Sequence, residues 1–287
     1  MESSVLLEVS RAIGKGLEAQ NCRLEIKSIG GDGMFWQHQN LAEGIGIWIP
    51  LSDWKKSVSE YTGISVLDKL PEDFVPCMSA AIFEVVGQWL VESVSETPSS
   101  YTLEQDVYPI LTLNGIRCVL VRWPVNEWQP MVSHWAPCIT DSPSVSLSLI
   151  AGYIPQTQPQ PDLPEVGNGL WLDSETDIEQ SQAILWWQRP LAKVRMQDDP
   201  DSEEKVMVIE EVLTEIDFHY PPLLAELASV SLSLADVGTM AQGDGIPVKF
   251  VNHGQLSLCR QTDASHKESF GNITLLRSPD GLIAKLI

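Results

Sequence analysis

The chain has 287 residues, of which 39 are Asp or Glu and 18 are Lys or Arg, so its net charge is −21. A chain this acidic does not favour binding to nucleic acid, or to an anionic membrane, through its overall field. Apolar residues make up 44% of the sequence, enough to build buried cores, which excludes a disordered chain. No run of ~20 apolar residues predicts a membrane span, and the first ten residues, MESSVLLEVS, carry no basic region typical of a signal peptide.

Residues 1–142 are predicted to form one mixed α/β domain. Seven of the ten tryptophans lie between Trp36 and Trp135. The predicted elements are a short helix at 51–61 capped by Ser52 or Asp53, a long helix at 71–95, and two strands at 108–113 and 115–123 joined by a turn at Asn114.

The cysteines do not form a disulfide framework. The five of them are odd in number, widely spaced and never in a C-x-x-C pair. This pattern indicates reduced thiols of a cytosolic protein, used mainly as small buried residues. They are Cys22, Cys77, Cys118, Cys138 and Cys259.

From residue 143 onward the sequence predicts mostly strands. Alternating apolar residues at 145–149 begin this region. The Pro- and Gln-rich tract at 155–164 is interpreted as a loop within a β domain, with a polyproline ligand for a partner as the alternative. The acidic run at 197–204 contains proline and predicts a solvated loop insertion.

A self-similarity with an offset of 76 residues is the most informative feature of this half. Gly167-Asn168-Gly169 is followed by Leu-Trp-Leu, and Gly243-Asp244-Gly245 by Ile-Pro-Val. Each copy predicts a tight glycine turn and then a strand, because Asn and Asp tolerate left-handed backbone. Further strands are expected at 183–187 and 205–212 in the first copy, and at 255–260 and 271–276 in the second. Upstream of the second glycine turn, after an apolar segment at 223–227, residues 230–237 are expected to form a strand that runs into a short helical turn. Units of about 70 residues are marginal alone, so we expect the two copies to pack together or interlock.

The pattern of the second copy resembles the SPOA (surface presentation of antigens) domain. The resemblance lies in Leu232-Ser233-Leu234-Ala235-Asp236-Val237, the Gly243-Asp244 turn and the closing strand near Gly271. The first copy resembles a more divergent SPOA domain, with Asn168 where the family usually has Asp. The implied fold class is α+β, with an N-terminal mixed α/β domain at 1–142 and two small strand-rich SPOA domains at 143–213 and 214–287.

This arrangement is similar to the SctQ family (YscQ, SpaO, HrcQ), the cytosolic ring or sorting-platform proteins of bacterial type III secretion systems. The resemblance implies a non-enzymatic scaffold in the cytoplasm, at the cytoplasmic face of the secretion apparatus. Its implied partners are an SctL-like stator protein, an SctK-like adaptor, the export ATPase complex and chaperone–effector complexes, with no cofactor.

Alternatives remain open. The flagellar switch proteins FliM and FliN are related, but FliM has one SPOA domain and FliN is much shorter. A ligand-binding protein or enzyme with a β tail is the alternative from a different class.

The candidate site residues serve three roles. The structural turns are Gly167, Asn168, Gly169, Gly243, Asp244 and Gly245. The candidate partner-binding residues are Trp186, Trp187, Leu232, Leu234 and Val237, with one of the two tryptophans expected to enter a core and the other to face a partner. Met207 is a candidate internal start, preferred over Met196. The family resemblance implies that a fragment beginning there associates with the full-length chain, and we expect it to pair with itself.

Catalytic and metal chemistry is weakly indicated. The glycines at 30–33 lack the Lys-Ser/Thr that follows a phosphate-binding loop, and are interpreted as a tight turn. His134 and Cys138 are four residues apart, but Pro137 interrupts any helix between them and no second ligand pair is near. No G-x-S-x-G motif occurs. The sequence therefore predicts no catalytic, cofactor or metal site.

Overall fold

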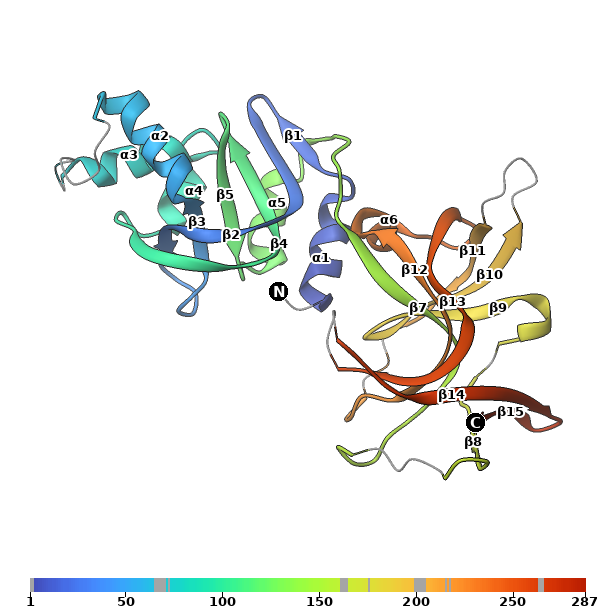
Figure 1. Ribbon diagram of the computed structural model, residues 1–287. Coiled ribbons are helices and arrows are strands. Elements are labelled where there is room, and N and C mark those ends of the chain that lie inside the picture. The colour runs from blue at the N-terminus through green and yellow to red at the C-terminus, as the bar shows by residue number, and fades with distance from the viewer. Residues whose placement is uncertain are drawn as a thin grey trace. The chain divides into compact units, whose positions relative to one another are not determined.

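In the computed structural model, residues 1–143 and 144–287 form two units, here called the N-terminal unit and the C-terminal unit (Figure 1). The structure describes residues 3–64, 71, 73–160, 165–174, 176–198, 205–214, 216, 218–262 and 266–287. Both units combine helices with strands, which confirms the predicted mixture of α and β structure.

The N-terminal unit contains one sheet with helices packed against it. Its elements are α1 (Ser3–Ile13), β1 (Leu17–Ala19), β2 (Cys22–Gln37), β3 (Gly46–Pro50), α2 (Leu51–Thr62), α3 (Phe74–Phe83), α4 (Gln88–Ser93), β4 (Ser99–Leu113), β5 (Ile116–Val121), α5 (Val125–Val132) and β6 (Ala136–Pro137). In the described residues the strand order is β3-β5-β4-β2-β1-β6, and β2 also pairs with β3. The strands β2, β3, β5 and β4 therefore close into a ring.

Tryptophan side chains account for much of this unit's core. Trp36 of β2 is fully buried, and its ring contacts Trp54 of α2 and Phe83 of α3 at centroid distances of 5.2 and 5.4 Å. Its Nε1 donates a 2.9 Å hydrogen bond to Oγ of Ser79 in α3. Because a buried indole N–H needs an acceptor, this contact fixes α3 over the sheet as well as filling the core.

A carboxylate–guanidinium pair attaches α2 to the sheet. Asp53, in the first turn of α2, accepts hydrogen bonds from Nε (2.8 Å), Nη2 (2.8 Å) and the backbone N–H (3.1 Å) of Arg117 in β5. Burial of the Asp53 carboxyl opposes its ionisation, but the Arg117 contacts outweigh burial and hold the pKa of Asp53 below its ordinary value. Pro50 precedes the helix, and neither Ser52 nor Asp53 caps it, which corrects the sequence prediction.

Several predicted elements of this unit are confirmed, and two are wrong. The helix at 51–61 and the two strands around Asn114 are present. The long helix predicted at 71–95 is instead α3 and α4, because Gly87 between them has φ of +148°, which ends a helix.

The glycines at 30–33 do not form a tight turn but lie within β2, where the register shifts beside Gly31. A Cβ on Gly33 would lie 2.4 Å from the Ile49 carbonyl oxygen, and one on Gly30 would lie 2.6 Å from Cα of Gln105. These glycines therefore allow close approach of neighbouring strands where the ring closes.

The C-terminal unit is built almost entirely of strands. Its elements are β7 (Ser144–Ile154), β8 (Gly169–Trp171), the 3₁₀ turn η2 (Ile178–Gln180), β9 (Gln182–Trp187), β10 (Arg189–Asp198), β11 (Lys205–Val212), β12 (Leu223–Ser233), α6 (Leu234–Thr239), β13 (Gly245–Gln261), β14 (Lys267–Ser278) and β15 (Gly281–Leu286). The strands predicted from the repeat are confirmed, and 230–237 is a strand running into the short helix α6, as predicted. Neither β10 nor the final strand β15 was predicted, and β10 includes residues 197 and 198 of the acidic run that was expected to be a loop. Most of the acidic run, 199–204, and part of the Pro/Gln tract, 161–164, lie outside the described residues.

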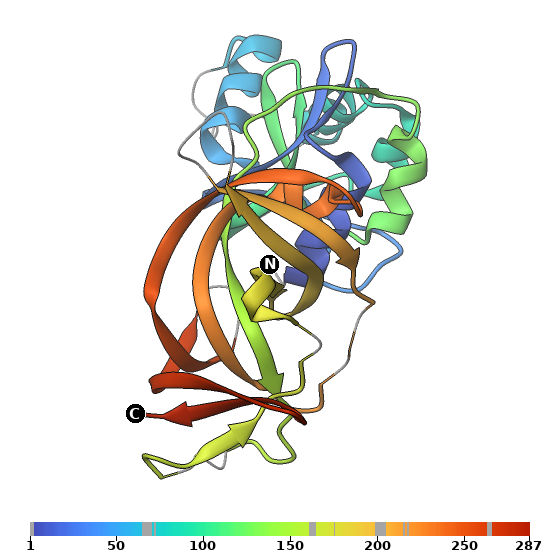
Figure 2. The same cartoon turned by 90° about the vertical axis from the view of Figure 1, so that its right-hand side faces the viewer.

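The described strands of this unit form two closed rings that share β7, β12 and β13. One ring runs β7-β9-β10-β11-β13-β12 and closes because β11 pairs with β13 as well as with β10. The other runs β7-β12-β13-β14-β15-β8 and closes through a bridge between Tyr153 of β7 and Asp173, just after β8. Figure 2 shows the strong curvature of the long strands that these closures require. The two predicted SPOA segments therefore share one strand system, rather than forming separate sheets.

The central pair of strands follows the repeat. In the antiparallel pair of β7 and β12, Ile150 lies opposite Glu226, the residue 76 positions later. Exchanging the two copies maps the pair Leu149–Ala228 onto Gly152–Ala225, and it interchanges the next two pairs on either side in the same way. An approximate two-fold axis thus passes between Ile150 and Glu226, and relates the first repeat to the second.

Replacing Asp53 by Asn is expected to lower the free energy of unfolding by about 1 kcal/mol at pH 7, since Arg117 is half-exposed and solvent weakens the pair. The folded-state pKa of Asp53 is lowered, so its contribution is present above the unfolded pKa near 3.8 and is lost as pH falls through the folded value. The measurement is urea unfolding of the variant and the wild type at pH 7 and at pH 3. The difference between their free energies of unfolding should be smaller at pH 3 than at pH 7. The exposed Glu60→Gln variant is the control, and an equal effect of both substitutions would contradict the assignment.

Candidate functional site

The two glycine turns predicted from the sequence occupy equivalent places in the C-terminal unit. Gly167 and Gly243 have φ of +95° and +93°, which confirms a glycine turn in each copy. The left-handed residue is the first glycine of each turn and not Asn168 or Asp244, whose tolerance of such backbone suggested the turns. Only glycine adopts such backbone without strain. Gly169 and Gly245 each begin the strand that follows, β8 and β13.

Each turn binds the closing strand of the other repeat. The N–H of Gly167 donates to the carbonyl of Leu286 in β15 (2.9 Å), and the N–H of Leu286 donates to the carbonyl of Asn168 (3.3 Å). In the same way Gly243 donates to Ile209 of β11 (2.8 Å), which donates back to Asp244 (2.9 Å). We call these reciprocal pairs of hydrogen bonds the cross-latches.

The candidate partner-binding residues do not lie on a surface. Trp186 and Trp187 are 1% and 2% exposed, and Leu232, Leu234 and Val237 are also buried. The expectation that one tryptophan faces outward is therefore wrong. Both faces of β9 are covered: Trp186 packs against Tyr153 and Phe218 at ring distances of 5.6 and 5.7 Å, and Trp187, the next residue along the strand, is buried as well.

An exposed apolar row lies elsewhere, across β14, β15 and β8. Leu276, Ile283 and Trp171 are direct cross-strand neighbours, and we call them the Trp171 row. Trp171 is 53% exposed and Leu276 is 43% exposed, with Ile283 half-buried between them. The sequence did not predict this row, because β15 was not predicted. A signal was present, since the apolar run at 282–284 follows a glycine, as is typical of a buried strand.

A glycine makes room for the middle of the Trp171 row. A Cβ on Gly169 would lie 2.4 Å from Cγ2 of Ile283 and would displace that side chain, whereas one on Gly281, 3.8 Å from the indole of Trp171, would make only ordinary van der Waals contact. Exposed apolar residues gathered on one face are typical of an interaction site.

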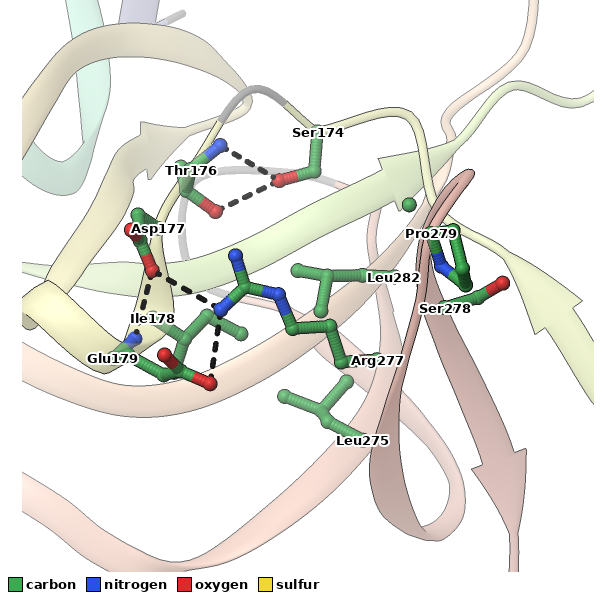
Figure 3. Close-up of a pocket in the computed structure, with 11 residues that line it drawn as sticks. Ser174, Thr176, Asp177, Ile178, Glu179, Leu275, Arg277, Ser278, Pro279 and Leu282 are labelled. Carbon is green, nitrogen blue, oxygen red and sulfur yellow. Dashed lines mark hydrogen bonds and ion pairs between the residues drawn. The ribbon is translucent and has the colours of Figure 1, made fainter.

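A hollow of about 500 Å³ lies between the η2 segment and the β14–β15 hairpin (Figure 3). The Arg277 guanidinium reaches the carboxylates of Glu179 (2.9 Å) and Asp177 (3.7 Å). The hydrogen bond to Glu179 and both negative charges raise the pKa of Arg277. The hydroxyls of Ser174 and Thr176 bond to each other (2.7 Å) and to the Ala151 carbonyl. Apolar side chains also line the hollow, namely Ile178, Leu275 and Leu282.

The charged and hydroxyl groups named at this hollow are hydrogen-bonded or ion-paired with one another and with the Ala151 carbonyl. Burial raises the pKa of the thiols of Cys22, Cys118 and Cys259, the last to about 12, and so disfavours their thiolates. Cys77, in contrast, is exposed, which corrects its expected burial. Within the ranges that the structure describes, no three His, Cys, Asp or Glu side chains are grouped to hold a metal ion, and no helix is long and apolar enough to cross a membrane.

Comparison with known proteins does not assign the chain. No protein-family model matches it, and no curated protein shows significant similarity to it.

Replacing Gly243 by Val should lower the free energy of unfolding by at least ~1 kcal/mol, because a β-branched residue resists the backbone conformation found there. Gly167→Val should cost a similar amount, since the two turns are equivalent. Gly243→Asn is the matched control and should lose less, because Asn tolerates left-handed backbone. Urea unfolding of the full chain measures all three, and unchanged stability for Val at both positions would contradict the role of the turns.

Proposed function

We propose that this chain is a non-enzymatic scaffold of the cytosolic sorting platform of a bacterial type III secretion system. The observation that supports this most directly is the tandem repeat, whose turns and closing strands engage each other through the cross-latches. The resemblance of both copies to SPOA domains supports the same proposal. It lies mainly in the residue pattern at Leu232–Val237 and in the Gly243–Asp244 turn.

In this role the chain binds other proteins of the platform and has no substrate of its own. Its proposed partners are an SctL-like stator protein, an SctK-like adaptor, the export ATPase complex and chaperone–effector complexes. The proposed location is the cytoplasmic face of the secretion apparatus.

The Trp171 row replaces the buried tryptophans as the proposed surface for the stator protein. An apolar segment of the partner laid across β14, β15 and β8 would cover Trp171, Ile283 and Leu276 together. Exposed aromatic residues contribute strongly to protein interfaces, because they bury a large area at low entropic cost.

Trp171→Glu is expected to abolish co-purification with the stator protein, because it places a charge within the covered apolar surface and removes its largest side chain. The measurement is a pull-down from cells that express the secretion genes, together with a melting curve to show that the fold survives. Tyr61→Glu is the matched control, since Tyr61 is 54% exposed but lies in the N-terminal unit. If Trp171→Glu still binds the stator protein, the Trp171 row is not the binding surface. If the wild type captures no secretion protein, the proposed function itself is contradicted.

An internal start at Met207 is a further expectation from the same resemblance. A fragment 207–287 would retain Ile209, Gly243 and Asp244, and so one complete cross-latch. A C-terminally tagged native gene should then give a second band near ~9 kDa that associates with the full-length chain, a size typical of a single small folded unit.

Met207→Leu should remove that band. Leu is the suitable replacement because Met207 is fully buried, and a volume-conserving change is tolerated far better than truncation to Ala. Immunoblotting against the tag measures the outcome. A single full-length band from the native gene would show that the chain acts without the fragment.

A further inference from the structure

Glu226 is a buried carboxylate at the centre of the C-terminal unit. It lies on β12 and is 7% exposed. Its Oε1 accepts hydrogen bonds from Lys267 Nζ (2.5 Å) and Ser229 Oγ (2.7 Å), and the Cys259 thiol lies 3.6 Å from its Oε2. All three partners belong to the second repeat. The charge of Glu226 is therefore compensated within its own repeat, by one cation.

The residue opposite Glu226 across the strand pair is apolar. Ile150 of β7 is fully buried and is the direct cross-strand neighbour of Glu226. It is also the counterpart of Glu226 in the repeat, because the two-fold axis passes between them. The two repeats thus differ in charge at the one place where each meets its own equivalent.

This position has a consequence for pairing between repeats. If two second repeats paired through β12 in the native register, Glu226 of one would lie opposite Glu226 of the other, with Cβ atoms about 5 Å apart. Two carboxylates at that distance in a buried site repel each other, and each would keep only its own Lys267. Each would also lose the apolar Ile150 as its cross-strand neighbour. Two first repeats would place Ile150 against Ile150, with no such penalty.

We propose that Glu226 makes the second repeat selective for a first repeat. The β12 side of the second repeat accepts a β7-type strand with an apolar residue at the axis, from the same chain or from another copy of it, and rejects another second repeat. A fragment that contains only the second repeat would then bind full-length chains rather than itself, contrary to the sequence-based expectation. This inference rests on strand register and does not depend on the secretion function.

Exchange between cut chains tests the selectivity. A protease site is inserted between Thr214 and Glu215, in the connection from β11 to β12, and the full-length protein is folded before it is cut. The two pieces are allowed to exchange at pH 7 in urea just below the unfolding midpoint, and native mass spectrometry counts the pairs. In the wild type, pairs of two C-terminal pieces should be at least tenfold rarer than in Glu226→Gln.

Glu268→Gln is the matched control for this exchange. It removes a half-exposed carboxylate of the same repeat that bonds to Arg260 and lies away from the axis. It should behave as the wild type does. Equal shares of C-terminal pairs in the wild type and in Glu226→Gln would overturn the proposal.

A second measurement leaves the second repeat unchanged, so it can overturn the proposal even if Glu226→Gln does not fold. In the intact chain, Ile150→Glu should melt at a lower temperature than Ile150→Gln at pH 7, because Glu adds a second charge opposite Glu226 to the cost of burying a carboxylate. The melting curves are recorded in trimethylamine N-oxide, which keeps weakened variants folded. In chains that also carry Glu226→Gln the gap should narrow, because only the cost of burial remains. Equal melting temperatures for Ile150→Glu and Ile150→Gln would overturn the proposal.

Discussion

The antiparallel pairing of β7 with β12 is the contact on which the rest of the C-terminal unit depends. Both closed rings contain these two strands, so every other strand of the unit is positioned relative to them. Their side chains are largely withdrawn from water, including Ile150, Leu223, Leu224 and Val230, each fully buried. At roughly 1.5–3 kcal/mol for each such side chain, this seam is a major source of the unit's stability.

The same pairing places a chemical difference between the two repeats. Duplicated units that meet at a two-fold axis would be identical there unless their residues diverge. At this axis one repeat presents Ile150 and the other Glu226, and the carboxylate is satisfied by Lys267 and Ser229 from its own side. A buried polar residue at a symmetric contact can specify which partner is chosen, at some cost in stability.

Local patterns predicted much of the fold. Period-two alternation identified most strands of the C-terminal unit, and Asn114 and Gly243 marked turns because their backbone conformations are uncommon for other residues. Predictions failed where distant segments decide the outcome. The glycines at 30–33 indicated a turn locally, yet they serve the approach of β3 and β4 to β2, which no local signal reveals.

The candidate site shows the same limit. The positions of the glycine turns were found from the repeat, but not the fact that each turn binds the other repeat's strand. Trp186 and Trp187 suggested one buried and one exposed side chain, since neighbours on a strand point to opposite faces. Phe218, which arrives from the connection to β12, packs against Trp186, and Trp187 is buried as well. The row that contains Trp171 could not be predicted from β8 alone, because the row requires β15, which lies far along the chain from β8.

The cross-latches also set an order of events during synthesis. Gly167 leaves the ribosome long before Leu286, the last residue of β15, so the turn of the first repeat must wait for its acceptor while the whole second repeat is made. Contacts between such distant segments form slowly, because a long loop has to close first. Until then β8 has no strand beside it, and its Trp171 and neighbouring backbone are open to other chains. Nascent chains on neighbouring ribosomes could therefore exchange repeats before either has closed its own rings.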